Sequence, residues 1–362
     1  MKNYQNAVFW ISTVCILWGA AALALIFVLL AFLPPIVAAV LFGLASIVSL
    51  TLILSTTSSL NPARKAAAVL NRKKIASSQL SLKPISRLRL LPLVEYYTVD
   101  PVLSSSFAVS YYLETDEDRI LFDLGIKLWE EDEAVLYRNA RTLNAQGKFS
   151  LEKVDCIVNS HAHNDHLAAR PDETILSEPD NPLQGKPFYA VEKLDVRGGG
   201  LKLIEQPALI SPTAGSTGPL ISVLFIAGPV REQSLVFHLA GRGLVLIIGC
   251  GHPGVRLIIE ASEQIFGEKV WGIIGGLHYP VTTDRTHMGR FFHPQQLIGG
   301  PQSYPWFPIS KRQVKQDIYY LQHKGIQYLA ISAHDSCDWT LQHFKDSKIP
   351  SQVVKIGEEI VL

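Results

Sequence analysis

The residues most able to do chemistry lie in one short segment, Ser160–His166, which reads Ser-His-Ala-His-Asn-Asp-His. Three histidines and an aspartate fall within six residues, directly after the apolar run Val154–Asn159, which predicts a strand. Imidazole and carboxylate groups are suitable ligands for zinc and similar divalent ions. A histidine-rich tract of this density indicates metal binding more often than a chance group of surface histidines.

The spacing of these residues predicts two groups of ligands. His161 and His163 alternate along the chain, so their side chains can share one face of an extended segment. Asp165 and His166 follow at the start of the next helix, where they can face a second ion. We therefore expect two divalent metal ions, with zinc as the first choice and manganese or iron as alternatives.

The segment resembles the HxHxDH signature of the metallo-β-lactamase-fold superfamily and matches it at every position. Upstream, Arg119–Gly125 resembles the strand of that fold that ends in an acid, here Asp123. In the family this acid holds a ligand histidine in orientation, which meets the need of a metal-bound imidazole for a partner at its other nitrogen. An ordinary strand-end or helix-capping aspartate is the alternative interpretation.

Three further elements resemble one subgroup of the superfamily, the dihydropterin–ribofuranosylaminobenzene phosphate synthase-like proteins. They are a Gly-x-x-Arg turn at Gly228–Arg231, a GC-x-H-x-G element at Gly249–Gly254 and a GG-x-H element at Gly275–His278. The subgroup's last ligand histidine matches His334, but the residues that follow, Asp335–Asp338, depart from its Cys-Thr-Gly-like turn. Substrate contacts beside His334 are therefore expected to differ from those of the subgroup.

The resemblance implies which side chains hold the metal ions. One ion is assigned to His161, His163 and His252, and the other to Asp165, His166 and His334. Many members of the superfamily carry a bridging aspartate where this chain has Cys250. We favour a buried structural role for Cys250, because burial is the commoner state of cysteine, and metal ligation is the alternative.

The resemblance also implies a reaction. A metal-bound hydroxide would attack a phosphate ester or a related small-molecule substrate, with Asp165 counted as a catalytic residue as well as a ligand. His278 is expected to donate a proton or a hydrogen bond to developing charge, and Arg231 to bind a phosphate group. A structural histidine and a surface ion pair are equally good interpretations of these two residues.

These inferences predict a dinuclear metal-dependent hydrolase. A hydrolase of carboxylic esters, lactones or amides is one alternative, and a pterin-pathway synthase-like enzyme is another. From a different class, a metal-stabilised binding protein without turnover is a third, although the presence of all six expected ligands argues against a decayed site. The assignment of a reaction rests on analogy, because one fold hosts many activities.

The N-terminal stretch has the composition of a membrane anchor. No charged residue occurs between Lys2 and Arg64, and the runs Ala7–Leu33 and Ile36–Leu54 are each long enough to cross a bilayer. Pro34-Pro35 separates them as a helix stop. This pattern predicts a transmembrane helical hairpin over residues 1–60; a signal peptide fits poorly because its apolar core is only about 7–15 residues long.

The residues after the predicted hairpin set its orientation. A basic juxtamembrane linker over residues 61–89 carries eight Lys and Arg, which favours a cytoplasmic location for the body and a membrane partner. From residue 95 onward, 24 Lys and Arg face 32 Asp and Glu, so the body is acidic and nucleic acid is not an expected partner. The four cysteines form no CxxC pair, which favours a reducing compartment. Nothing in the pattern indicates an oligomeric state.

The body, residues 90–362, is expected to form one catalytic domain whose elements position the site. Strands are expected at Leu90–Tyr97, Phe107–Leu113, Ile120–Leu124, Val154–Asn159, Leu220–Ile226, Ser234–Leu239, Leu244–Ile248, Val270–Ile274 and Ile326–Ile331. Helices are expected at Leu128–Leu143, Val255–Phe266, Lys311–His323 and Thr340–Lys345. Strands precede the alternation with helices, which favours mixed sheets, and the resemblance implies an αββα sandwich.

One aromatic-rich segment, Pro280–Pro308, shows little periodicity. Its large side chains are Phe291, Phe292, Tyr304, Trp306 and Phe307. A loop of this length is usually functional or disordered, and its aromatic content favours a packed lid or a substrate wall, with membrane contact as a further possibility.

Overall fold

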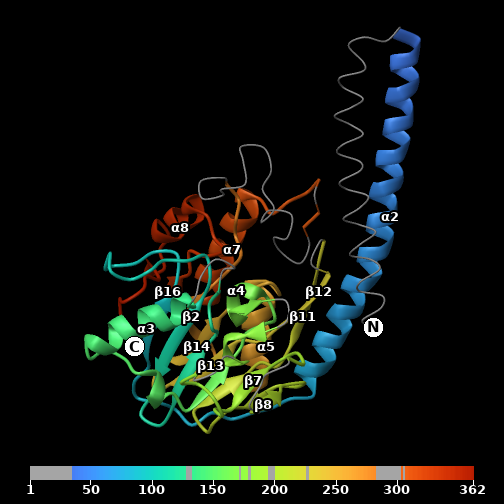
Figure 1. Cartoon of the computed structure of the whole chain (residues 1–362). Helices are drawn as coiled ribbons and strands as arrows, with labels where there is room; N and C mark the ends of the chain where they lie inside the picture. The colour runs from blue at the N-terminus through green and yellow to red at the C-terminus, as the bar shows by residue number, and fades with distance from the viewer. Residues whose placement is uncertain are drawn as a thin grey trace.

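The computed structural model describes residues 35–362 except 128–132, 171–172, 178–180, 195–199, 226–227, 283–302 and 305. Two seven-stranded mixed sheets form the body (Figure 1). The order in the first sheet is β18 (Ile360–Val361), β1 (Arg89–Val94), β2 (Ser110–Glu114), β3 (Arg119–Phe122), β4 (Cys156–Val158), β7 (Phe188–Ala190) and β8 (Leu201–Leu203). The order in the second is β17 (Ser351–Val353), β16 (Tyr328–Ile331), β15 (Val270–Gly275), β14 (Gly243–Ile248), β13 (Leu235–Leu239), β10 (Ala214–Ser216) and β9 (Ala208–Leu209).

Two short ribbons and several helices complete the described part of the chain. The ribbons pair β11 (Leu220–Leu224) with β12 (Gly228–Glu232), and β5 (Ala169–Arg170) with β6 (Glu173–Thr174). The helices of the body are α3 (Val135–Ala145), α4 (Asn164–Leu167), α5 (Val255–Phe266), α7 (Lys311–Lys324) and α8 (Asp338–Lys345), with 3-10 turns at Leu151–Lys153 and Ile175–Ser177.

The alternation of side chains along each strand explains how the layers pack. In β14, Val245 and Ile247 lie in the core between the two sheets, whereas Leu244, Leu246 and Ile248 face the opposite side. That opposite side is covered by α5, α7 and α8, and the outer face of the first sheet is covered by α3. The result is the αββα sandwich that the resemblance implies, with the mixed sheets that the order of strands and helices predicts.

All nine expected strand segments contain a strand, and α5 has the bounds that the periodicity predicts. The sequence missed β5 to β10, β12, β17 and β18, which are two to five residues long and too short to display a two-residue period. The expected helix at Leu128–Leu143 begins only at Val135 in the described residues. The aromatic positions Phe291 and Phe292 lie outside the described residues.

One long helix occupies the described part of the N-terminal region. Helix α2, Pro35–Ala76, is a single helix of 42 residues that runs through the expected linker instead of ending near Leu54. It continues past Pro62 because the residues that follow, including Ala66, Ala67 and Ala68, are strong helix formers. The exposed polar and basic side chains of this stretch had suggested a linker, but they are compatible with an exposed helix.

Among the described residues, Val40–Ala76 is the one helix long and apolar enough to cross a membrane, and its most apolar window is not buried against the body. In Figure 1 the N-terminal, apolar part of α2 (blue) projects far from the body. The first expected span, Ala7–Leu33, lies outside the described residues, so the two-helix hairpin is not confirmed and stays a prediction.

Candidate metal centre

Strand ends from both sheets bring the site together. Strands β14, β15 and β16 are parallel neighbours, and so are β3 and β4, so their carboxyl ends lie at common edges. The segments that follow these five strands carry the predicted site residues Asp123, His161, His163, Asp165, His166, His252, His278 and His334. The fold therefore gathers residues that are up to 211 positions apart in the chain.

Three histidine rings form the first group. The Nδ1 atom of His163 lies 3.0 Å from Nε2 of His161 and 3.2 Å from Nε2 of His252. Burial, together with the neighbouring histidines, holds the pKa of His161 and of His252 well below the usual value. Both rings are therefore neutral at pH 7, and their unprotonated nitrogens can bind a cation.

The second group surrounds the thiol of Cys250. Its Sγ atom lies 3.1 Å from Nε2 of His166 and 3.3 Å from Nε2 of His334. Ligand atoms of Asp165, His166, Cys250 and His334 all lie within 4.8 Å of one another, as do those of His161, Cys250 and His252. Cys250 is 3% exposed, as the expected buried role requires. It also takes part in both groups, so its sulfur lies at the centre of the cluster.

The donor set fits divalent transition-metal ions. Imidazole nitrogens, a carboxylate and a thiol converge in a buried space, which is the combination that zinc and its neighbours accept. The Nδ1 atom of His252 is buried and has no hydrogen-bond partner in the described part of the chain, which is unusual for a polar atom without an ion nearby. Burial alone would lower the pKa of His166, but Asp165 and Asp123 outweigh it and raise that pKa to about 9, so a metal ion would have to displace the proton from Nε2 of His166 to bind there.

Asp123 makes the contact expected from the sequence. Its Oδ2 atom lies 2.7 Å from Nδ1 of His166 and accepts the hydroxyl of Ser160 at 2.8 Å, while Oδ1 accepts the backbone N–H of Ser160 at 2.7 Å. Asp123 is fully buried and has a φ of +60°, a strained conformation that its position at the end of β3 maintains. The carboxylate orients His166 with its Nε2 atom toward the cluster.

Glu95 orients the other side of the cluster, and the sequence analysis missed it. Its Oε2 atom accepts the hydroxyl of Ser332 at 2.5 Å. The hydroxyl oxygen of Ser332 in turn lies 2.5 Å from Nδ1 of His334. Burial raises the pKa of Glu95, although hydrogen bonds from its neighbours oppose this. It lies just after β1, far from any recognisable motif, so no signal in the sequence pointed to it.

Glu232 is the second residue that the sequence analysis missed. It ends β12, one position after the Gly-x-x-Arg turn, and accepts backbone N–H groups from Cys250, Gly251 and His252 at 2.7–3.0 Å. Since successive side chains of a strand point to opposite faces, Arg231 points away from this turn. Arg231 instead pairs across the ribbon with Ile221 and lies near Lys74 of α2, so the structure does not bring it into the cluster.

His278 stands beside the cluster. Its ring centroid is 4.6 Å from that of His252, its Nδ1 atom is 3.8 Å from Oδ2 of Asp335, and its backbone N–H donates to the same oxygen at 2.9 Å. Asp335, which follows His334, therefore fixes the turn that carries His278. Burial raises the pKa of Asp335 well above its usual value.

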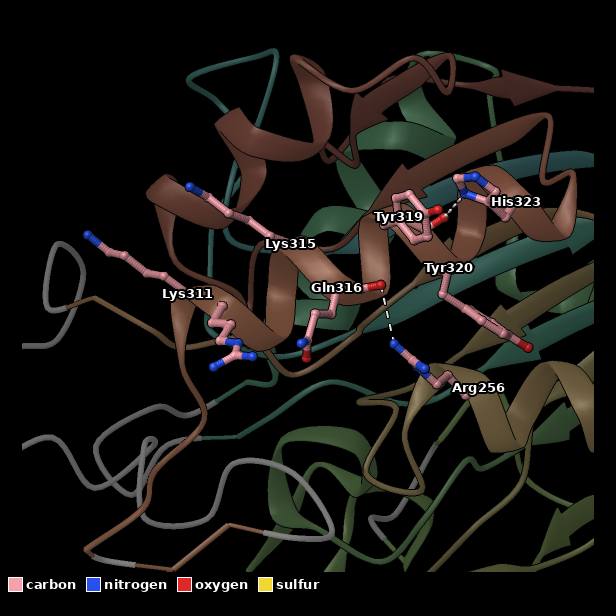
Figure 2. A pocket seen from close by; sticks show the side chains of 8 residues that line it. Arg256, Lys311, Lys315, Gln316, Tyr319, Tyr320 and His323 are labelled. Carbon is pink, nitrogen blue, oxygen red and sulfur yellow. Dashed lines mark hydrogen bonds between the residues drawn. The ribbon is translucent and has the colours of Figure 1, made fainter.

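Two cavities lie near these elements. The larger, about 810 Å³, is an open groove on α7 and α5 that contains none of the predicted site residues. Figure 2 shows Lys311 and Lys315 projecting from α7 while Arg256 reaches across from α5 and donates to the backbone oxygen of Gln316. The second cavity, about 650 Å³, is lined by His278 and Gly251 and by none of the six predicted ligands, so it reaches the edge of the candidate site through the neighbours of His252.

Comparisons with known proteins agree with the motif and the fold. Residues 105–172, which contain Asp123 and the histidine-rich segment, match the model of the metallo-beta-lactamase superfamily. A relative from Methanocaldococcus jannaschii, 7,8-dihydropterin-6-methyl-4-(beta-D-ribofuranosyl)-aminobenzene-5'-phosphate synthase, is 23% identical over 55% of this chain and 80% of its own length. The predicted resemblance to the superfamily is thus confirmed, and the relative supports the predicted subgroup.

Solved structures share the architecture. Tm1679, described as a metal-dependent hydrolase of the beta-lactamase superfamily, has 17% identity and a TM-score of 0.52, with 75% of this chain and 98% of the other covered. The metallo-beta-lactamase fold protein YhfI from Bacillus subtilis has 15% identity and a TM-score of 0.46, with 76% and 100% covered. The likeness to Tm1679 shows that the body of this chain has the metallo-β-lactamase fold.

Proposed function

We propose that this protein is a membrane-anchored metal-dependent hydrolase that holds two divalent ions and cleaves a phosphate ester. The observation that carries the proposal is the convergence of six predicted ligands, drawn from three separate strand ends, into one buried cluster. A stability role alone would not require so many buried imidazoles, since each costs free energy to desolvate.

Each group of ligands is assigned one ion. His161, His163 and His252 would hold the first, and Asp165, His166 and His334 the second, with Cys250 between them. Two such ions would supply Lewis acidity and would lower the pKa of a bound water. Zinc is the favoured metal, because the set of imidazole, carboxylate and thiol suits it.

The protein's own residues would position the reactants. Asp123 would hold the ring of His166 in place, and Glu95 would hold that of His334 through the hydroxyl of Ser332. Asp165 would accept a proton from the attacking water. His278 lines the 650 Å³ cavity at the edge of the cluster, with both of its ring nitrogens buried. We assign His278 the donation of a proton or a hydrogen bond to the leaving oxygen.

Elemental analysis of the purified full-length protein tests the proposal. The wild type should carry about two equivalents of a transition metal, and the His163→Ala variant clearly less. His323→Ala is the matched control, because His323 lies on α7 outside the cluster. A wild type that binds no metal when metal is supplied, or binds two equivalents and cleaves no phosphate ester, carboxylic ester, lactone or amide, would overturn the hydrolase assignment.

A synthase-like reaction is the second candidate, favoured by the 23% identity to the relative from M. jannaschii. It predicts turnover only when a dihydropterin that carries a leaving group on its 6-methyl carbon and a phosphorylated aminobenzene riboside are supplied together, with that leaving group released. Product analysis by mass spectrometry with both compounds, and with each alone, separates a synthase from a hydrolase.

A further inference from the structure

The cavity that reaches His278 has an unexpected wall, the juxtamembrane part of α2. On one side it is lined by Gly251, Pro253 and His278, and on the other by Arg64, Ala68 and Arg72 of α2. The helix that carries the candidate membrane span thus also borders the candidate catalytic site. Figure 1 shows this lower part of α2 beside the β11–β12 ribbon.

Specific contacts fix this wall in place. Asn71 is 2% exposed; its Nδ2 atom donates to the backbone oxygen of Ile221 at 2.9 Å, and its Oδ1 atom accepts the N–H of Ile221 at 2.8 Å. Arg64 donates to the backbone oxygen of Val223 at 3.0 Å and to that of Ser303 at 2.7 Å. One turn of α2 is therefore joined to the edge of β11, and another to the rim of the cavity.

The segment of α2 that lines the cavity continues directly into the apolar part of the same helix. Phe42, Ile47 and Leu54 are exposed on α2, where no part of the described body covers them. At a rise of about 1.5 Å per residue, the ten residues from Leu54 to Arg64 span about 15 Å. If the apolar part lies in a bilayer, the mouth of the cavity lies close to the membrane surface.

The lining of the cavity combines positive charge with apolar surface. Arg64, Arg72 and Arg256 face two acids, Glu260 and Asp317, and Asp317 is already paired with Arg256 at 2.7 Å. Arg72 is exposed and forms no ion pair with the described acidic side chains. Leu257, Leu277, Phe307 and Ile309 supply apolar lining, and Phe307 is 74% exposed.

From this arrangement we propose that the cavity binds a phosphate ester that carries a long apolar chain and enters from the membrane surface. The phosphate lies between His278 and Arg72, and the chain passes Ala68 and Phe307 toward the apolar part of α2. This inference rests on the proposed function, because it names the substrate class of the same site. It gives the membrane helix a role in substrate selection as well as in anchoring.

The test uses the full-length protein in nanodiscs of neutral lipid and two chromogenic substrates. One is bis(p-nitrophenyl) phosphate, which is water-soluble, and the other is p-nitrophenyl dodecyl phosphate. The wild type should prefer the dodecyl ester by about tenfold in kcat/KM, because the chain buries apolar area in the cavity. The variant Ala68→Trp should remove this preference by filling the path of the chain, and Arg72→Glu should lower kcat/KM for both esters by about tenfold through repulsion.

Matched controls lie on the same helix. Ala66→Trp and Lys73→Glu introduce the same bulk and a similar charge change at exposed positions that do not line the cavity, so both should behave as the wild type. A readout without turnover is labelling by a dodecyl phosphate with a diazirine on its chain, mapped by mass spectrometry. Labels should fall on residues 64–72 or 307–309 and be lost in Ala68→Trp.

The outcomes separate the two proposals. Cleavage of the short ester without a preference for the dodecyl ester, together with labels away from α2, would overturn the inference and leave the hydrolase standing. Labelling at α2 without cleavage of either ester would overturn the assignment of a phosphate ester as the substrate and keep the binding site. Equal effects of Ala68→Trp and Ala66→Trp would also contradict the proposed path of the chain.

Discussion

Glu232 and His252 are joined by a hydrogen bond that links two separate elements of the site. Oε2 of Glu232 accepts the backbone N–H of His252 at 2.8 Å, and Oε1 accepts the N–H groups of Cys250 and Gly251 at 3.0 and 2.7 Å. Burial raises the pKa of Glu232 to about 7, although these three donors favour its charged form. One carboxylate from the β11–β12 ribbon thus shapes the turn that presents His252 to the cluster.

Glu232→Gln should loosen this turn. An amide offers one accepting oxygen in place of two, so at least one backbone N–H loses its partner and faces an NH2 group. We expect a loss of about 1–3 kcal/mol in the free energy of unfolding and about a tenfold loss in metal affinity. Competition with a chromogenic chelator measures the affinity; Glu205→Gln, at an exposed position, is the control. An unchanged affinity would show that the turn keeps its form without the carboxylate.

Asp123→Asn tests the orientation of His166. Asparagine tolerates the left-handed backbone at this position, so the substitution changes the hydrogen bonding and little else. An amide that donates to Nδ1 of His166 would move the ring proton to Nε2, the nitrogen that faces the cluster. The affinity for the second metal ion should fall about 10–100-fold.

The matched control is Asp116→Asn, because Asp116 is an exposed acid that accepts the hydroxyl of Ser86 far from the site. Isothermal titration with zinc should show one unchanged site and one weakened site in Asp123→Asn, and two unchanged sites in the control. If both sites weakened equally in Asp123→Asn, the division of ligands into two groups would be wrong.

The sequence predicted the layered fold well because each long strand has a clear pattern of burial. Strand β14, for example, is apolar throughout and buried on both faces, and α5 shows a helical period against it. Short strands such as β18 carry two residues and owe their existence to pairing with β1, which local sequence cannot reveal. Helix α2 extends beyond the expected span Ile36–Leu54, because charge marks the end of a membrane span but does not end a helix.

The candidate ligands could be found because histidine at a strand end is a local signal. The residues that hold them, Glu95 and Glu232, carry no such signal, since each acts on a segment more than 17 positions away. Arg231 shows the converse: its motif was recognisable, but the side chain points to the opposite face from Glu232. One step along a strand reverses the direction of a side chain, and the sequence does not fix that register.

Gly276→Ala should damage the turn between β15 and His278. A Cβ atom at this position would overlap the backbone oxygen of Gly249 and the carboxylate of Asp335. Since Asp335 also accepts the backbone N–H of His278, the turn must shift, and we expect kcat to fall at least about tenfold. Metal content should fall less, because His278 is assigned to the substrate.

The control for this prediction is Gly272→Ala on the same strand, where the Cβ would lie 3.5 Å from the side chain of Tyr328, an ordinary contact. Steady-state kinetics and elemental analysis of both variants check the expectation. Equal kcat values in the two variants would show that the tight packing at Gly276 does not govern the position of His278.

The ion pair between Arg89 and Glu359 predicts a pH dependence of stability. Nη2 of Arg89 lies 2.8 Å from Oε1 of Glu359 and joins β1 to the segment before β18. This hydrogen bond lowers the pKa of Glu359 below its usual value. The pair therefore stabilises the fold above the pKa of the unfolded state, about 4.3, and this stabilisation is lost as the pH falls through the lower folded pKa.

Glu359→Gln should accordingly lower the free energy of unfolding at pH 7 and have no effect at a pH below the folded pKa. The side chain is 35% exposed, so solvent screening limits the difference at pH 7 to about 0.2–1 kcal/mol, and added salt should reduce it. Urea unfolding followed by tryptophan fluorescence measures it between pH 3 and 8, with Glu358→Gln, which removes a more exposed charge next to it, as the control. A difference that grows as the pH falls would contradict the assignment, because it would mean that the folded protein binds the proton more tightly than the unfolded chain does.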